Sequence, residues 1–153
     1  MPEKRVIEVE IFSDGSCIGN PGPGGWAAIL RYNRHEREIF GHEEDTTNNR
    51  MELKSVIEAL SLLKRSCAVN IYTDSQYVQK GMTEWIDSWR KKGFKTKKGI
   101  FRKNHDLWLI LDDLSKKHNI RWHWVRGHSG HIENERVDVL ARKAAMRKSA
   151  RLD

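Results

Sequence analysis

Residues 68–75 read AVNIYTDS, and this stretch decides the fold class of the 153-residue chain. Its first six residues are rich in apolar side chains and match a short strand. Asp74 and Ser75 follow directly and are typical of the first positions of a helix. A strand that leads straight into a helix indicates parallel strand pairing, so we predict an α/β fold.

The N-terminal part of the chain predicts three antiparallel strands. Residues 7–11 alternate between apolar and acidic side chains, which is the period of a half-buried strand. The glycine- and proline-rich residues 19–25 predict a turn. Strand-like runs follow at residues 26–32 and 37–41, so a meander of three strands is the simplest interpretation.

Helical spacing of apolar residues appears in three segments between the predicted strands and beyond them. Leu53 to Leu63 form one such segment, behind the polar residues 46–49, which can cap a helix. Thr83 is the candidate cap of a short helix, and Asn104 is the candidate cap of the helix after it.

The C-terminal third predicts one more strand and a last helix. Ile120, Trp122 and Trp124 alternate as a fifth strand, and we expect both tryptophans in the core. The loop of residues 126–131 precedes a helix that carries apolar residues on one face between residues 137 and 144.

Composition and cysteine usage limit the class of protein. A chain of this length can bury the core of one domain without disulfides or a structural metal. Cys17 and Cys67 lie far apart and match neither a zinc site nor a thioredoxin motif. The first residues lack the apolar region of a signal peptide, and apolar runs such as residues 26–30 are too short to span a bilayer. We therefore predict a cytoplasmic protein.

The net charge of +7 is concentrated in one segment. Residues 85–105 contain eight basic residues and one acidic residue, so this segment accounts for the whole excess. Three aromatic side chains, Trp85, Trp89 and Phe94, lie within it. Basic residues interleaved with aromatic ones favour a nucleic-acid surface over a solvated loop.

Four acidic residues stand in short polar motifs and are the candidate metal ligands: Asp14, Glu52, Asp74 and Asp138. Carboxylates gathered in one pocket repel one another and stay ionised at neutral pH only when cations neutralise them. Oxygen ligands of this kind favour magnesium or manganese over zinc. Any one of these acids alone is more often a surface group or a helix cap, and Asp138 can also pair with Arg142 one helical turn later.

Five motifs in order resemble bacterial ribonuclease HI, of the type 1 ribonuclease H family: residues 14–17, 47–52, 73–78, 127–131 and 133–138. The resemblance covers nearly the whole chain. It implies the ribonuclease H-like fold, a five-stranded mixed sheet of three antiparallel and then two parallel strands, with helices on both faces. It also implies a single catalytic domain over residues 1–153 with a basic handle at about residues 83–103.

The activity that the resemblance implies is hydrolysis of the RNA strand of RNA–DNA hybrids. Asp14, Glu52, Asp74 and Asp138 would hold two magnesium ions, with manganese as a substitute, and these ions would activate the attacking water and stabilise the leaving oxygen. The family's products carry 5′-phosphate and 3′-hydroxyl ends. His128 matches a family position that assists the attacking water or product release, and a histidine between glycines suits proton transfer.

Several further positions match family residues that contact the hybrid. Amide side chains near the cut are Asn20, Asn48 and Gln76, which can donate and accept hydrogen bonds. Thr47 and Asn104 match the pocket for a DNA phosphate, and Asn49 matches a DNA-strand contact.

The basic segment with its aromatic residues resembles the family's handle. Trp85, Trp89 and Phe94 would pack on deoxyribose, and the basic side chains would neutralise phosphates. The handle's basic residues are Arg90, Lys91, Lys92, Lys95, Lys97 and Lys98. A chain with its own handle is expected to act as a monomer. No motif specifies a protein partner, and a docked replication-protein tail would leave no readable pattern.

Three departures from the family pattern stand out. Ser13 replaces the commoner threonine, Phe94 stands where the handle often has tryptophan, and the chain stops soon after the last helix. Two other functions remain open. One is a non-catalytic module that binds hybrids or double-stranded RNA, which hybrid affinity without cleavage would favour. The other is a DNA resolvase or transposase core of the same fold, which cleavage of DNA junctions would favour.

Overall fold

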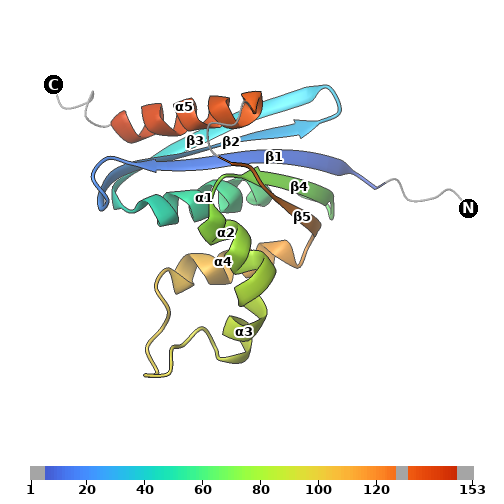
Figure 1. Cartoon of the computed structure of the whole chain (residues 1–153). Helices are drawn as coiled ribbons and strands as arrows, with labels where there is room; N and C mark the ends of the chain where they lie inside the picture. Colours follow the sequence, from blue (N-terminus) through green and yellow to red (C-terminus); the bar gives the residue numbers. More distant parts are fainter. Residues whose placement is uncertain (1–5, 127–130, 148–153) are drawn as a thin grey trace, which may run out of the picture.

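The computed structural model describes residues 6–126 and 131–147, and its centre is a five-stranded mixed sheet in the order β3-β2-β1-β4-β5 (Figure 1). The strands are β1 (Glu8–Cys17), β2 (Gly22–Tyr32), β3 (His35–Thr46), β4 (Ala68–Thr73) and β5 (Asn119–Trp124). β1 and β3 pair antiparallel with β2, whereas β4 pairs parallel with β1 and with β5. The predicted α/β class and the mixed strand pattern are confirmed.

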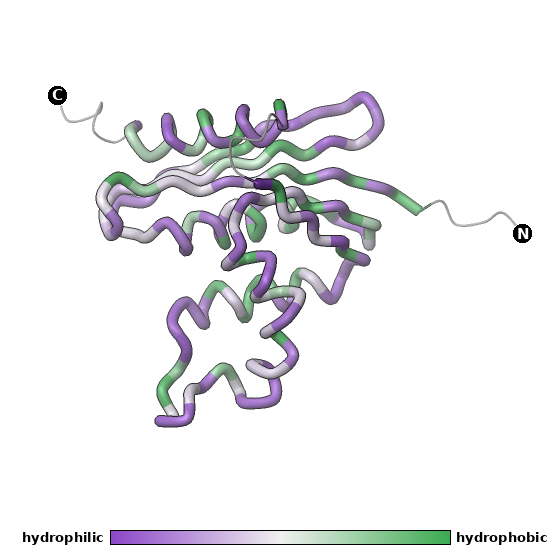
Figure 2. The backbone as a smooth tube through the Cα atoms, in the orientation of Figure 1, coloured by the Kyte–Doolittle hydropathy of each residue, from purple (hydrophilic) through white to green (hydrophobic). Residues whose placement is uncertain are grey.

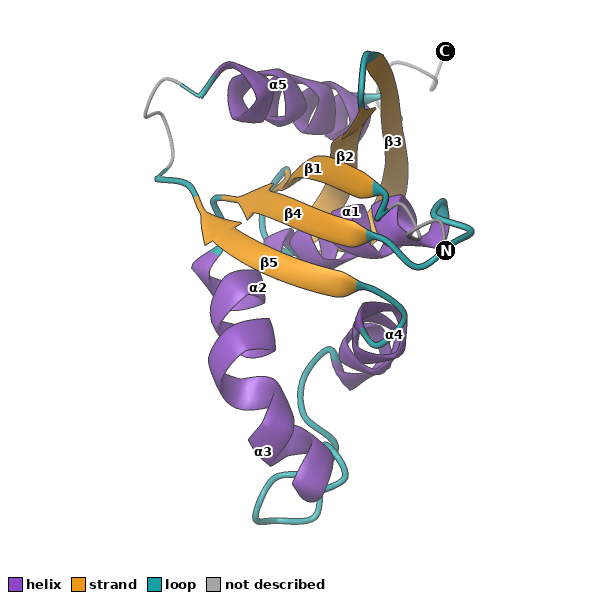
Figure 3. Cartoon of the chain, turned by 90° about the vertical axis from the view of Figure 1, so that its right-hand side faces the viewer, coloured by secondary structure: helices purple, strands orange, loops and turns teal. Residues whose placement is uncertain are grey.

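Helices cover both faces of the sheet, as predicted. They are α1 (Asn48–Ser61), α2 (Gln76–Lys80), the π-helical turn η1 (Gly81–Trp85), α3 (Ile86–Lys91), α4 (His105–Ser115) and α5 (Ile132–Met146). α5 packs alone on one face, over β1 and β2, and α1 packs on the opposite face with α4 behind it (Figures 1 and 3). α3 and the loop after it project away from the sheet (Figure 3).

Two hydrophobic clusters stabilise these layers. The larger lies between the sheet and the α1–α4 layer and includes Ile11, Leu53, Ile71 and Trp108. The smaller lies under α5 and is built from five residues that include Phe12. The loop below α3 is mostly hydrophilic along the chain, in contrast to the central strands (Figure 2). The sheet and its two helical layers therefore hold most of the core, and the projecting segment contributes Ile86 and Phe94 to the larger cluster.

The first three strands are longer than the sequence pattern predicts, whereas β4 has the predicted bounds. The turn expected over residues 19–25 ends early, because β2 already begins at Gly22 and pairs with the end of β1. The reason is close packing: a Cβ atom at Gly25 would collide with the α5 backbone at Ala141 and Ala145. Glycine here lets a helix approach a strand, whereas the sequence interpretation treated it as a turn signal.

The expected helix start at Thr83 is wrong. α2, η1 and α3 form one uninterrupted helical run, and Thr83 lies inside it, where its hydroxyl donates to the Gln79 carbonyl at 2.7 Å. The true cap is Ser75, whose hydroxyl oxygen accepts from the Val78 amide at 3.1 Å. The helix therefore begins directly after β4, at the point where Asp74 stands.

Within the described residues, none of the helices is long and apolar enough to cross a membrane. Cys17 and Cys67 are both free thiols.

Candidate active site

The ends of β1 and β4 bring two of the predicted acids together. Ser13 and Thr73 are partners in the parallel β1–β4 register, so the next residue on each strand, Asp14 and Asp74, emerges at the same edge of the sheet. Asp14 still belongs to β1 and pairs with Ala27 of β2, which fixes its backbone. Parallel pairing, which the sequence predicted from residues 68–75, is thus what brings the two carboxylates together.

Glu52 comes to the same place from the first turns of α1. The helix begins at its N-cap Thr47, whose hydroxyl accepts from the Arg50 amide at 3.3 Å. α1 can approach β1 closely because residue 15 is glycine: a Cβ atom there would overlap the Glu52 backbone nitrogen. The absence of a side chain at Gly15 therefore allows the carboxylates of Asp14 and Glu52 to lie side by side.

Three of the four predicted acids form a compact group. Carboxylate oxygens of Asp14, Glu52 and Asp74 all lie within 4.8 Å of one another. Asp14 and Glu52 are buried. Asp138, on α5, is not in this group, but it contributes to the shift of the Asp14 pKa, so its carboxylate acts on Asp14. Asp138 also pairs with Arg142 at 2.9 Å, as the sequence predicted.

Crowding raises the pKa of both buried acids. Burial and then the charge of Asp74 raise the pKa of Asp14 from 3.8 to about 8. Burial raises the pKa of Glu52 well above its usual value as well, with the charges of Asp14 and Asp74 adding to the effect. Burial and the neighbouring acids thus disfavour the charged forms of Asp14 and Glu52, which is the electrostatic condition that a bound cation relieves.

The donor set fits a divalent metal ion that prefers oxygen ligands. Glu52 Oε2 is buried and has no hydrogen-bond partner among the described residues, a costly state for a carboxylate oxygen. The three grouped side chains offer only carboxylate oxygens, the donors that Mg²⁺ and Mn²⁺ prefer. Asp14, Glu52 and Asp74, with Asp138 beside them, are therefore the residues that would hold such an ion.

A family comparison agrees with this arrangement. The model of the RNase H family matches residues 7–146. This chain belongs to the ribonuclease H family. Among similar proteins, the ribonuclease H of Cupriavidus metallidurans is 62% identical over 136 residues, which cover 89% of this chain and 94% of that protein. The ribonuclease H of Halorhodospira halophila is 55% identical over 141 residues, covering 92% and 94%. Ribonucleases H are metal-dependent hydrolases, and the chain is an enzyme of this family.

Solved structures show the same fold. LC9-RNase H1, described as a type 1 RNase H with the type 2 active-site motif, superposes with a TM-score of 0.84 at 37% identity, covering 94% of this chain and 74% of that one. LC11-RNase H1, solved in complex with an RNA/DNA hybrid, gives a TM-score of 0.71 at 18% identity, covering 92% and 99%. The second likeness shows the fold alone.

The predicted amide contacts of the ribonuclease H site lie around the acids on exposed positions. Asn20 and Asn48 are in direct contact, because the Asn48 amide donates to Asn20 Oδ1 at 3.0 Å. Gln76 is exposed in the first turn of α2, two residues after Asp74. Asn49 is exposed beside Asn48 at the start of α1. Their hydrogen bonds to a hybrid stay predictions.

The two residues predicted to bind a DNA phosphate, Thr47 and Asn104, are joined by a residue to which the sequence assigned no role. The Arg50 amide donates to Thr47, and its guanidinium donates to Asn104 Oδ1 at 3.2 Å and to both Asp106 carboxylate oxygens at 3.0 and 2.7 Å. Asn104 is the N-cap of α4, as predicted, but its side chain does not cap the helix and donates instead to the Tyr77 hydroxyl at 3.1 Å. The position of Arg50 inside the motif of residues 47–52 was the available signal.

The handle departs from the prediction at two residues. Arg90 donates to both carboxylate oxygens of Asp112, at 3.0 and 2.6 Å, and to Asp87 at 2.9 Å, so its charge joins α3 to α4 and is already neutralised. Phe94 is only 4% exposed and belongs to the larger core cluster, so it is a core residue and not a surface for deoxyribose. Both side chains therefore have structural roles, Arg90 in an ion pair between two helices and Phe94 in the core.

The other handle residues lie where a ligand can reach them. The lysines at 91, 92, 95, 97 and 98 are all exposed. Trp85 is 37% exposed, and its ring lies 5.6 Å from that of Trp89, which packs in turn on the buried Trp108. Phe101, which the sequence interpretation left without a role, is half exposed, with the Lys95 ammonium 5.1 Å from its ring centre. The signal available in the sequence was the position of Phe101 within the basic segment.

The fifth strand corrects one core assignment. Trp122 packs against the larger cluster, as expected, but Trp124 is 41% exposed, so its assignment to the core is wrong. Its indole N–H donates to the main-chain carbonyl of Asp74 at 3.1 Å. The predicted role of His128 lies outside the described residues.

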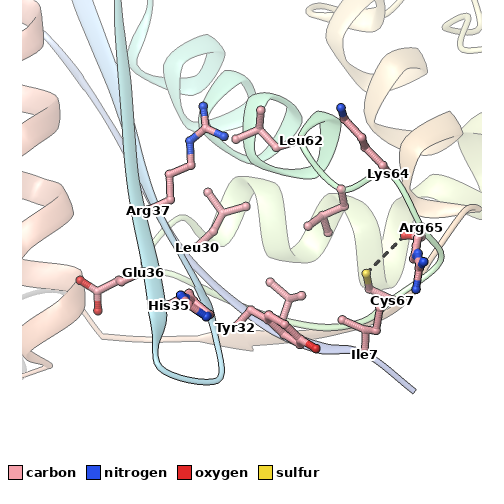
Figure 4. Close-up of a pocket in the computed structure, with 12 residues that line it drawn as sticks. Ile7, Leu30, Tyr32, His35, Glu36, Arg37, Leu62, Lys64, Arg65 and Cys67 are labelled. Atoms are coloured by element: carbon pink, nitrogen blue, oxygen red, sulfur yellow. Dashed lines mark hydrogen bonds between the residues drawn. The ribbon is translucent and has the colours of Figure 1, made fainter. Parts of the chain in front are cut away.

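A pocket of about 430 Å³ lies at another part of the surface (Figure 4). Its lining includes Ile7, Leu30 and Leu62, with the charged side chains of Arg37, Lys64 and Arg65 around them. None of the residues that line it belongs to the acidic group or to the handle. The candidate active site is therefore the carboxylate group at the sheet edge and not this pocket.

Proposed function

We propose that this ribonuclease H hydrolyses the RNA strand of RNA–DNA hybrids, that magnesium ions bound by Asp14, Glu52, Asp74 and Asp138 support the reaction, and that the products carry 5′-phosphate and 3′-hydroxyl ends. The observation that carries the proposal is the group of three carboxylates within 4.8 Å, with a buried Glu52 oxygen that has no hydrogen-bond partner in the part of the chain that the structure describes. Membership of the ribonuclease H family, with relatives named ribonuclease H at 55–62% identity, supports the substrate class.

The chemistry that the metal supplies is neutralisation of charge on the scissile phosphate and on the attacking and leaving oxygens. The acidic side chains would hold and orient the metal. The strand and helix backbone fixes Asp14 and Glu52, and Asp74 lies just before the start of α2. Water attacks phosphorus and gives up a proton, the bond from phosphorus to the 3′ oxygen breaks, and that oxygen takes up a proton to become the 3′-hydroxyl. We assign to His128 an auxiliary role, assisting the attacking water or product release, on its residue type and its position in the sequence.

Recognition of a hybrid requires contacts to ribose on one strand and to deoxyribose on the other. Asn20, Asn48 and Gln76 stand next to the acids and can both donate and accept. The exposed lysines of the handle add a sequence-independent attraction to phosphates. We propose that Trp85 supplies a planar surface for a sugar at the base of the handle, and that the protein acts as a monomer in the cytoplasm.

The test is cleavage of a labelled RNA–DNA hybrid beside matched duplex DNA, duplex RNA and single-stranded RNA, with magnesium or with EDTA. We expect cleavage of the RNA strand of the hybrid alone, dependent on magnesium and lost in Asp14→Asn. Asp113→Asn, which removes an exposed acid of α4, is the matched control and should keep full activity. Tight hybrid binding without cleavage in magnesium or manganese would instead identify a binding module, and cleavage of DNA junctions would identify a DNA nuclease.

A further inference from the structure

Asp74 differs from the other two grouped acids in how it is held. Asp14 lies within a strand and Glu52 within a helix, and both are buried, whereas Asp74 stands between β4 and α2 and lies nearer to solvent. Packing around the side chain therefore does less to orient the Asp74 carboxylate. The backbone at the junction therefore contributes to where this carboxylate lies.

Main-chain hydrogen bonds engage the carbonyls on either side of Asp74, whereas the Asp74 carbonyl accepts from a side chain. The Thr73 carbonyl accepts from the Val125 amide at 2.8 Å, as the end of the β4–β5 ladder. The Ser75 carbonyl accepts from the Gln79 amide at 3.1 Å, as the first bond of the helix. Asp74 lies between the last ladder bond and the first helical bond, and its carbonyl accepts from the indole N–H of Trp124 at 3.1 Å.

Trp124 is placed for this bond and not for the core. It is the last residue of β5, it is 41% exposed, and a tryptophan that served packing alone would be expected to bury more of its ring. Among aromatic side chains, only tryptophan carries a donor on a ring nitrogen that is not also a titrating group. A phenylalanine would keep much of the contact area and lose the donor.

We propose that Trp124 is a positioning residue that fixes the backbone of Asp74, and through it the place of the Asp74 carboxylate in the metal-binding group. This inference rests on the proposed metal-dependent function of that group. Groups that orient metal ligands typically contribute about 10- to 100-fold to metal affinity or activity. The contact of Trp124 with this group is its bond to the Asp74 main chain, so we expect its effect to pass through Asp74.

The experiment compares Trp124→Phe with Trp122→Phe, a control on the same strand whose ring packs against the core. Direct Mn²⁺ binding, followed by electron paramagnetic resonance on the metal-free proteins, is the first readout and does not depend on activity. We expect Trp124→Phe to weaken Mn²⁺ binding about 10-fold. The deficit in kcat should shrink as magnesium is raised, with KM for the hybrid unchanged. Trp122→Phe should change neither metal affinity nor its magnesium dependence.

Unchanged Mn²⁺ affinity in a folded Trp124→Phe protein would overturn the inference, and so would an effect on KM alone, which would make Trp124 a substrate contact. A second measurement uses the unaltered protein: magnesium should shift the Trp124 indole N–H resonance and slow its exchange with solvent. An indole resonance that does not respond to magnesium would also overturn it. If the unaltered protein binds Mn²⁺ but does not cleave hybrids, the proposed function fails while the positioning role stands.

Discussion

Two regions of the molecule shift the pKa of a buried aspartate in opposite directions. Asp14 at the sheet edge and Asp112 on α4 are equally buried, at 4% exposure each. The pKa of Asp14 is raised to about 8, chiefly by burial and then by Asp74, whereas the pKa of Asp112 is lowered, chiefly by its hydrogen bonds from Arg90. Burial raises the pKa of both acids, but at Asp14 the neighbouring charges belong to other acids and add to this effect, whereas at Asp112 those of Arg90 and Lys116 outweigh it.

The comparison distinguishes a binding site, whose charges lack a counter-charge in the protein, from an ion pair whose charges balance each other. The Arg90–Asp112 pair satisfies its own charges and joins α3 to α4, so it stabilises the handle without any ligand. The acidic group is electrostatically incomplete in the protein alone, and it becomes complete when a cation is added. A buried acid is therefore a sign of a binding site only when its counter-charge is missing from the fold.

The largest expected effect comes from Asp14→Asn. Loss of this ligand should lower hybrid cleavage by at least about 10³-fold, which corresponds to roughly 4 kcal/mol of transition-state stabilisation. In EDTA at pH 8 the variant should be more stable than the unaltered protein by about 1–3 kcal/mol, because it removes a charge that burial disfavours. Cleavage assays and urea unfolding measure the two effects.

The pH dependence of this stability difference has a definite sign. The pKa of folded Asp14 lies above its ordinary value of 3.8, so the folded chain holds this proton more tightly between about pH 4 and 8. The stability of the metal-free protein should therefore fall relative to Asp14→Asn as the pH rises from 5 to 8. Magnesium should cancel the difference. A variant that is less stable than the unaltered protein at pH 8 in EDTA would contradict the repulsion between these acids.

Asp112→Asn tests the other half of the comparison. Removal of one charge from the Arg90 pair should cost about 1–2 kcal/mol of unfolding free energy, below the usual cost for a buried pair because Arg90 is itself partly exposed. Because the pKa of Asp112 is lowered in the folded state, its contribution is present above the ordinary pKa of 3.8 and is lost as the pH falls below it.

Urea unfolding and amide hydrogen exchange in α3 and α4 measure the effect of Asp112→Asn. The control is Asp113→Asn, which changes the exposed neighbour and should leave both unaltered. Equal destabilisation by the two variants would mean that the Arg90 pair does not hold the handle.

The sequence predicted the fold class and three of the grouped acids. Strand alternation and the strand–helix junction at residues 68–75 indicated antiparallel and then parallel pairing, the family resemblance implied the five-stranded mixed sheet, and the parallel register brings Asp14 and Asp74 together. Glycine was the weak signal. The run at residues 19–25 was interpreted as a turn, but Gly25 is in a strand because α5 packs against it, and no local pattern carries information about a helix more than a hundred residues later.

The partners of individual side chains could not be predicted from the sequence either, because they also depend on contacts between distant segments. Arg90 and Phe94 look like handle residues by position, and only the packing of α3 on α4 shows that one is paired and the other buried. Trp124 has the alternation of a core residue, and its bond to the Asp74 carbonyl depends on the ends of two neighbouring strands. Pattern reasoning thus predicted elements and charges, whereas the partners of long side chains required the tertiary structure.

The smallest expected effect concerns the exposed charges of the handle. Lys91→Gln with Lys92→Gln should weaken hybrid binding by about 3- to 10-fold at low salt and reduce the slope of log affinity against log salt by about one to two, because each lysine that contacts a phosphate releases a counterion. The value of kcat at saturating hybrid should not change, since these lysines stand apart from the acidic group. Salt titrations of binding and steady-state kinetics give the two numbers.

The matched control for the handle lysines removes the same charge elsewhere, as Lys117→Gln with Lys143→Gln, from exposed positions on the loop after α4 and on α5. If binding depended only on net charge, both double variants would weaken it equally. A larger loss from the handle pair alone would assign the phosphate contact to that segment. Asp112 already neutralises Arg90, so substitution of Arg90 should lower stability and leave the salt slope unchanged. This result would distinguish the proposed phosphate contacts of the lysines from the structural role of the arginine.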